Sequence, residues 1–210
     1  ITLLGTSGNV GNGNDGVNLA KARIWVDTGD ITITGTAAAG SLASGNGIFI
    51  TGGSTVQQVG AGGGQITITG TSLAGDRGSN GVKLAGKAII EASGSGTVEI
   101  SGTAPAATTA NIGTFITGGA KVKSASGAID ISGTGGNGSA GSKFIGVMVS
   151  SKSGIESTGG NITITGTAGN GGAGNHGIFI TGTSVVKTGG AGSISITGTG
   201  ANTTSSPGVA

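Results

Sequence analysis

The chain of 210 residues lacks cysteine and tyrosine, and it has only two prolines and one histidine. Without cysteine, it can form neither a disulfide nor a thiolate metal site. Charged residues make up 9% and aromatic residues 2% of the sequence, so it has neither the basic stripe nor the interleaved aromatics of a nucleic-acid-binding surface. We therefore expect no nucleic-acid partner. The shortage of titratable groups also argues against an enzyme.

Long apolar segments are missing as well. No run approaches the roughly 20 residues of a membrane-spanning helix, and no signal peptide is recognisable. Glycine is abundant, with 50 residues, but there is no Gly-X-Y period and too little proline for collagen. The low charge and the many isoleucines, valines and threonines argue against disorder. These exclusions leave a glycine- and threonine-rich repetitive β protein.

One six-residue segment recurs seven times, and we call its copies the anchor segments. They are ITLLGT (1–6), ITITGT (31–36), ITITGT (66–71), VEISGT (98–103), IDISGT (129–134), ITITGT (162–167) and ISITGT (194–199). Successive copies start 30, 35, 32, 31, 33 and 32 residues apart. A second extended segment, which opens with a glycine as in GIFIT, and a third, weaker one recur in phase. Such a fixed period is typical of solenoids and other repeat architectures.

The anchor segments alternate between aliphatic and polar residues. Their first and third residues are all Ile, Val or Leu, and the residues between are Thr, Ser, Glu or Asp except for Leu4. This alternation predicts a strand with one buried face. One unit has too few apolar residues to fold alone, so we expect like strands to stack into one axial core. The predicted fold is all-β, a right-handed parallel β-helix (β-solenoid) with about 32 residues and three strands per coil and about six and a half coils.

Each anchor segment ends in a glycine followed by a threonine. We interpret the glycine as a place where the chain bends, because a Cβ would block the bend. The threonines would form a corner ladder in which hydroxyl groups bond from coil to coil. The ladder comprises Thr36, Thr71, Thr103, Thr134, Thr167 and Thr199. Asn-Gly pairs such as those at 46–47 and 80–81 are typical of turns.

Both ends of the chain fall inside a repeat. We expect residues 1–210 to be a single β-solenoid segment, either part of a longer repeat array or a subunit that stacks on other copies. Uncapped solenoid ends present unpaired strand edges, which are templates for further pairing. Self-association, end to end or lateral, is therefore the expected partner interaction.

A column of large side chains occupies one outward position of the second extended segment. It contains the candidate interface residues Phe49, Phe115, Met148 and Phe179. If exposed, they would form a lateral contact with another rod or a surface on which sugars stack. Alternatively, the neighbouring long loop folds over them and forms a small satellite core.

Charges of alternating sign occupy an outward column of the third extended segment. The column is Gln57, Glu91, Lys123, Glu156 and Lys187. Opposite charges on paired strands disfavour register slips, whereas solvated pairs contribute little stability. We therefore interpret this column as register control.

The outward face of the anchor segments bears paired threonines: Thr32/Thr34, Thr67/Thr69 and Thr163/Thr165. Such a face resembles that of β-solenoid ice-binding proteins, so a flat surface that binds ice or a glycan is an alternative function. Glu99 and Asp130 interrupt the array. Two close carboxylates suit a retaining glycosidase or a cation site, but two solvated acids need no ligand. A polysaccharide-cleaving enzyme is a further alternative. We assign no catalytic, cofactor-binding or metal-binding residue.

The [IV]-x-I-[TS]-G-T anchors and the G-[IV]-x-[IVL] second segments resemble the units of very large bacterial β-strand-repeat surface and secreted proteins. These are the filamentous-haemagglutinin-like and autotransporter-passenger-like adhesins. The resemblance covers nearly the whole chain. It implies an extracellular or cell-surface rod that forms fibres or bears adhesive elements, with glycans or a host surface as partners. It supplies neither a catalytic motif nor a cofactor. The expected function is structural, that of a bacterial surface filament or adhesin stalk.

Overall fold

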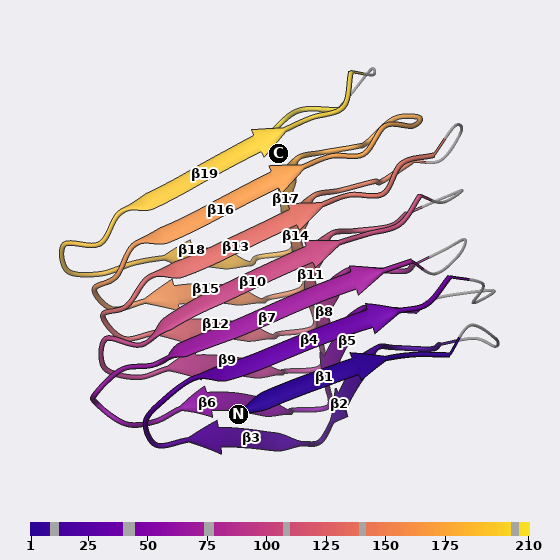
Figure 1. Ribbon diagram of the computed structural model, residues 1–210. Coiled ribbons are helices and arrows are strands. Elements are labelled where there is room, and N and C mark those ends of the chain that lie inside the picture. The colour runs from indigo at the N-terminus through magenta and orange to yellow at the C-terminus, as the bar shows by residue number, and fades with distance from the viewer. Residues whose placement is uncertain (9–12, 40–44, 74–77, 107–109, 139–141, 203–205) are drawn as a thin grey trace.

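The computed structural model describes residues 1–8, 13–39, 45–73, 78–106, 110–138, 142–202 and 206–210. Within these ranges the regular structure consists of β-strands in three parallel sheets. The chain winds as a right-handed β-helix, and each coil contributes one strand to each sheet (Figure 1). The predicted fold class is therefore confirmed. None of the described segments is a helix long and apolar enough to cross a membrane.

The anchor segments form a seven-stranded sheet, which we call the anchor sheet. Its strands, in spatial order, are β1 (Thr2–Thr6), β4 (Ile31–Ala37), β7 (Gln65–Ser72), β10 (Thr97–Thr103), β13 (Ile129–Thr134), β16 (Ile162–Thr167) and β19 (Ile194–Thr199). Equivalent residues of successive anchors lie opposite each other, as Ile33 and Ile68 do. Like residues therefore stack on like, as the repeat predicts.

The other two segments form sheets of six strands each. The second sheet contains β2 (Val17–Ala20), β5 (Ile48–Thr51), β8 (Val82–Leu84), β11 (Thr114–Ile116), β14 (Val147–Val149) and β17 (Ile178–Ile180). The third sheet contains β3 (Arg23–Val26), β6 (Thr55–Gln58), β9 (Ile89–Ala92), β12 (Lys121–Ser124), β15 (Gly154–Ser157) and β18 (Val185–Lys187). The described ends of the longer connections, which run from the anchor sheet to the second sheet, all lie on the same side of the rod (Figure 1).

The inward aliphatic side chains of the three sheets form one core along the axis. In the inner coils these side chains, such as Ile68, Val122 and Val149, are 0% exposed. Thr114 is the one hydroxyl residue in the inward columns of the second sheet, and its Oγ1 donates to Ser132 O at 2.6 Å. The core is open at both ends, because Ile1 is 55% exposed and Ile194 is 43% exposed.

Each anchor glycine faces the glycine that opens the second strand. A Cβ on Gly35 would lie 2.1 Å from Gly47 O, and a Cβ on Gly47 would lie 2.3 Å from Thr71 N. Two columns of glycine therefore let the backbones of the anchor and second sheets touch. Because β4 continues through Gly35 to Ala37, the glycine is needed for this close approach rather than for the bend that the sequence suggested.

A buried polar column precedes the second-strand glycines. Asn46 Nδ2 donates to Asp15 Oδ1 at 2.8 Å, and Asn80 Nδ2 donates to Asn46 Oδ1 at 2.8 Å. Asn46 and Asn80 are 5% and 2% exposed, so these bonds satisfy amides that water cannot reach. Backbone pairing continues here as well, since Gly47 N donates to Asn80 O at 2.9 Å. The Asn-Gly pairs at these positions thus join coils instead of forming isolated turns.

Candidate functional site

The anchor sheet presents three outward columns of short hydroxyl side chains. In β4 they are Thr32, Thr34 and Thr36, and the equivalent residues of β7 lie in register with them. Along the sheet every residue of these columns is Thr or Ser except Leu4, Glu99 and Asp130. The predicted threonine pairs therefore belong to one regular hydroxyl array.

The predicted threonine ladder is the third column of this array. Its members Thr36, Thr71, Thr103, Thr134, Thr167 and Thr199 are aligned in register. They lie on the strands themselves and face outward. Within the described ranges, no side-chain hydrogen bond joins one member to the next. The ladder is therefore part of the open face of the sheet.

Glu99 and Asp130 are exposed neighbours on β10 and β13. They border a hollow of about 230 Å³ whose other lining residues are Ile131 and hydroxyl residues. Gln65 Nε2 donates to Glu99 Oε2 at 3.1 Å. No group of three or more His, Cys, Asp or Glu side chains occurs in the part of the chain that the structure describes. Among the described residues, the two carboxylates thus have no third acidic or imidazole neighbour, which a cation site would normally include.

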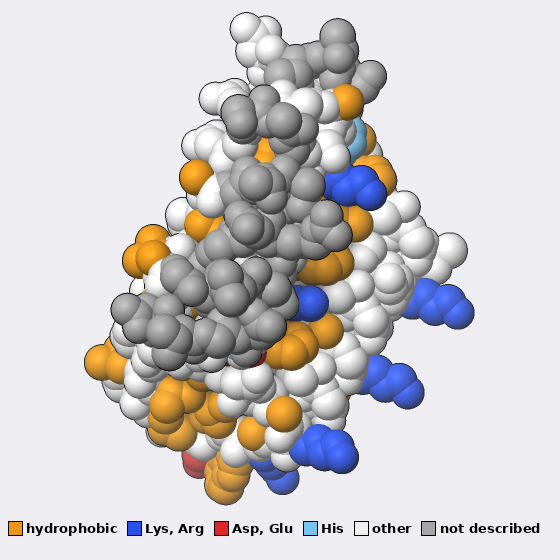
Figure 2. Space-filling model, turned by 90° about the vertical axis from the view of Figure 1, so that its right-hand side faces the viewer, with side chains coloured by type: hydrophobic (Ala, Val, Ile, Leu, Met, Phe, Trp, Pro, Cys, Tyr) orange, Lys and Arg blue, Asp and Glu red, His pale blue; other side chains and the backbone are white. Residues whose placement is uncertain are grey.

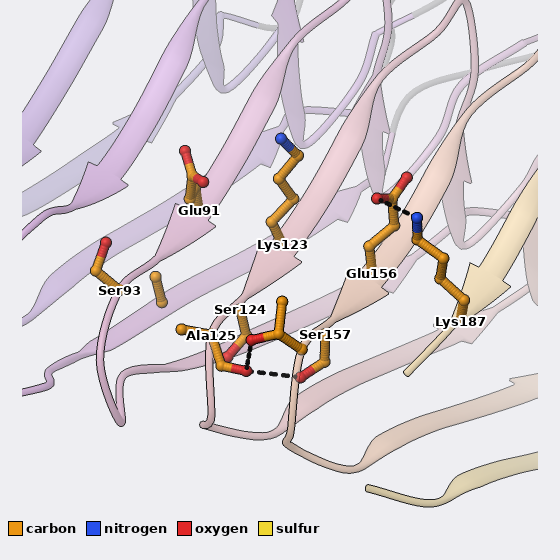
Figure 3. A pocket seen from close by; sticks show the side chains of 10 residues that line it. Glu91, Ser93, Lys123, Ser124, Ala125, Glu156, Ser157 and Lys187 are labelled. Carbon is orange, nitrogen blue, oxygen red and sulfur yellow. Dashed lines mark hydrogen bonds and ion pairs between the residues drawn. The ribbon is translucent and has the colours of Figure 1, made fainter. Parts of the chain in front are cut away.

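The third sheet borders a groove of about 300 Å³ that contains the charged column (Figure 3). Glu91, Lys123, Glu156 and Lys187 follow one another in register on β9, β12, β15 and β18. Serine side chains line the groove where the third strands end, and Ser157 Oγ donates to Ala125 O at 3.2 Å. The charged residues of neighbouring third strands therefore lie directly opposite each other, as the sequence predicts.

The ion pairs in this column are fewer than the alternation of charge suggests. Glu156 binds Lys121 at 2.8 Å and Lys187 at 3.2 Å. Glu91 accepts a hydrogen bond from Gln57 Nε2 at 2.9 Å. Among the described residues, Lys123 forms no ion pair with either acidic neighbour. Among the described residues, the ion pairs of this sheet therefore form a single network of Lys121, Glu156 and Lys187.

The pKa of the Glu156 carboxyl is lowered, chiefly by the hydrogen bond from Lys121 and further by Lys187, while partial burial opposes the shift. Because the folded pKa lies below the ordinary value of 4.5, the network stabilises the fold at neutral pH. This contribution is lost as the pH falls through the folded pKa. We expect Glu156→Gln to lower the free energy of unfolding by about 1 kcal/mol at neutral pH.

Urea unfolding over a series of pH values measures this effect. The difference between Glu156→Gln and the unsubstituted chain is expected to shrink below pH 4.5 and to vanish once Glu156 is protonated in both states. Glu91→Gln is the matched control, because Glu91 accepts a hydrogen bond from the Gln57 amide and, among the described residues, forms no ion pair with a lysine. A Glu156→Gln difference that is the same at every pH would show that the ion pairs are not its cause.

The second sheet bears the column of large side chains. Phe49, Phe115, Met148 and Phe179 lie in register together with Lys83. The Lys83 Nζ lies 5.2 Å from the centroid of the Phe49 ring and 5.9 Å from that of Phe115. These residues are half-buried. Figure 2 shows hydrophobic side chains gathered on this face beside the loops, with lysine or arginine side chains among them.

Three apolar loop residues near this column are buried. Phe144 is 0%, Ile145 2% and Ile112 7% exposed, and Ile112 and Ile145 border the same hollow as Met148 and Phe179. The column is therefore neither bare nor fully covered. The sequence analysis missed Phe144, because it lies outside the strands and no alternating pattern identifies it.

Comparison with protein-family models, with curated proteins and with solved structures gives no match. The structure itself shows a β-solenoid repeat protein. The candidate site is a set of three outward faces with different chemistry: a hydroxyl array, a charged groove and an apolar column with lysines.

Proposed function

We propose that this chain is a structural segment of an extracellular rod, a bacterial surface filament or adhesin stalk, whose coils join through strand edges. The supporting observation is the in-register stacking of three sheets around a core that is open at both ends. Ile1 and Ile194 are 55% and 43% exposed, whereas the equivalent Ile31 and Ile162 are 0% exposed. A further coil, from the same chain or from another copy, would bury these side chains and pair the edge strands.

The regularity of the coils also supports a rod. Each coil pairs only with the coils directly before and after it, so the structure can lengthen by about 4.8 Å per coil without a change in its lateral faces. The hydroxyl array and the charged groove run along this length. Such a rod would hold adhesive elements, for glycans or a host surface, away from the cell.

Electron microscopy and analytical ultracentrifugation of the purified chain test the assembly. We expect rods longer than one chain, and we expect Ile194→Glu to reduce them to single chains, because a carboxylate in the open core opposes stacking. Thr165→Glu adds the same charge to the exposed lateral face and should leave the rods intact. Association that is equally strong in both variants, or single chains of the unsubstituted protein, would contradict strand-edge assembly. Antibody labelling of intact source cells tests the surface location.

A second function is favoured by one observation, the three hydroxyl columns of the anchor sheet in continuous register. A regular array of this kind suits a flat, repetitive ligand such as a glycan or ice. This function would be supported if single chains inhibited the recrystallisation of ice or were retained on a glycan array. Neither function includes a reaction. If the unsubstituted chain released sugar from a polysaccharide and Glu99→Gln did not, both functions would be contradicted.

A further inference from the structure

A hollow of about 360 Å³ lies on the outer face of the second sheet, between loop residues of successive coils and the strands β14 and β17. Its apolar wall comprises Ile112, Ile145, Met148 and Phe179. Small-molecule sites are concave and mostly apolar, with volumes of about 300–1,000 Å³ and few polar groups. The hollow is at the small end of this range, which suits one short acyl chain better than a two-chain lipid.

The charged or titratable side chains that line the hollow are all basic. They are Lys143 and His176, and no acidic residue is among the lining residues that the structure describes. Lys143 forms no ion pair within the described ranges. The His176 ring stacks on Phe179 with centroids 5.0 Å apart, and its Nδ1 lacks a hydrogen-bond partner. An ammonium group beside an apolar wall complements a molecule with an anionic head and an apolar tail.

The backbone at Lys143 is a second, independent observation. Lys143 lies three residues before a second-strand glycine and has a φ of 65°. Gly13, Gly78 and Gly174 hold the equivalent position in other coils, with φ values of 70°, 72° and 77°. This left-handed conformation is unfavourable for any residue with a Cβ. The described residues with a Cβ at this position are Ala110, with a φ of 49°, and Lys143, and both line the hollow, where three other coils have the unstrained glycine.

We propose that this hollow binds a single-chain fatty carboxylate. The acyl chain lies against Ile112, Ile145, Met148 and Phe179, and the carboxylate pairs with the Lys143 ammonium group. The His176 ring, stacked on Phe179, completes the apolar wall. This binding does not depend on rod formation. Every residue involved lies on the lateral face of a complete coil, and none lies at an open end of the core.

Titration calorimetry with decanoate, below its micelle-forming concentration, tests the proposal. We expect the chain to bind decanoate, and we expect Lys143→Gly to weaken that binding about ten-fold or more, the loss of one charge-assisted contact. The same variant should raise the thermal midpoint of unfolding, since glycine fits the left-handed backbone without strain. Lys152→Gly is the matched control. Lys152 has a φ of 62° in the turn between β14 and β15 and does not line the hollow, so its removal should stabilise the chain equally and leave the decanoate affinity unchanged.

Decanol has the same apolar tail but an uncharged head, so it shows how much of the affinity comes from the anionic head. It should bind at least ten-fold more weakly than decanoate. Equal affinity for both ligands, or unchanged decanoate affinity in Lys143→Gly, would overturn the proposal. So would the absence of decanoate binding to the unsubstituted chain, including the case in which the chain binds only vesicles that contain anionic phospholipid.

Discussion

Replacing Gly102 by alanine is expected to lower the free energy of unfolding by more than about 3 kcal/mol, the upper end of the usual cost of overpacking. The new Cβ would lie 2.1 Å from Gly113 O and 2.6 Å from both Gly113 C and Thr114 Oγ1. Two of these atoms are backbone atoms, which cannot rotate away as a side chain does. The anchor and second sheets would have to separate in the middle of the rod, and β10 and β11 pair with a strand on each side.

Guanidinium unfolding followed by far-ultraviolet circular dichroism measures this loss. Gly62→Ala is the matched control, because Gly62 is exposed and a Cβ there would meet only Thr28 Cγ2, at 3.8 Å. We expect that variant to stay within about 0.5 kcal/mol of the unsubstituted chain. Equal losses in the two variants would mean that alanine harms this chain through general backbone effects, and not through the contact between the two glycine columns.

The second large effect is expected for Phe144→Ala, which should cost about 3–5 kcal/mol. The Phe144 side chain is 0% exposed, so its removal deletes a fully buried ring and leaves a cavity. The backbone bonds at this residue do not involve the side chain: Phe144 N donates to Asn175 Oδ1 at 2.9 Å, and Gly169 N donates to Phe144 O at 3.0 Å. The measured loss therefore reports the burial of the ring.

Phe115→Ala is the control for this substitution, since Phe115 is half-buried on the outer face of β11. Its removal should cost about 1 kcal/mol, roughly half of the transfer free energy of a fully buried ring. Because each coil contacts only its neighbours, solenoid stability is a sum of local terms. Hydrogen exchange should therefore locate the loss of protection in Phe144→Ala to the coils on either side of that residue. Similar losses in both variants would show that the full burial of the Phe144 ring is not the cause.

The strands and the core could be predicted because two simple patterns act together. Alternation with period two marks the inward residues of each strand, and the fixed repeat aligns equivalent residues, such as Ile33 and Ile68, in neighbouring coils. The glycine contact was not predictable in the same way. The pattern shows that Gly35 recurs, but its partner Gly47 belongs to another strand, and only the closed coil brings the two together.

Sequence reasoning missed several residues, because their local sequence predicts a different role or no role. An Asn-Gly pair is usually a turn, yet Asn46 and Asn80 use their amides to bond successive coils. Phe144 lies in a connection of variable length, so no column could be aligned through it. The alignment of the charged column was predictable, but the ion-pair partners of its residues were not. The Lys121 side chain reaches Glu156 across a diagonal, and side-chain reach of this kind depends on rotamers that a repeat pattern does not specify.

The paired glycine columns affect the long connections between the anchor strands and the second strands. Each long connection leaves the anchor strand just after one glycine and returns at the other, and the two backbones touch at that point. The base of the connection is thus closed independently of its contents. Between the anchor threonine and the returning glycine the chain holds 8 to 11 residues, of different sequence in every coil, while the strands on both sides keep their register. The rod can therefore carry a different loop on each coil, as long as contacts between neighbouring loops, such as the bond from Phe144 N to Asn175 Oδ1, are kept.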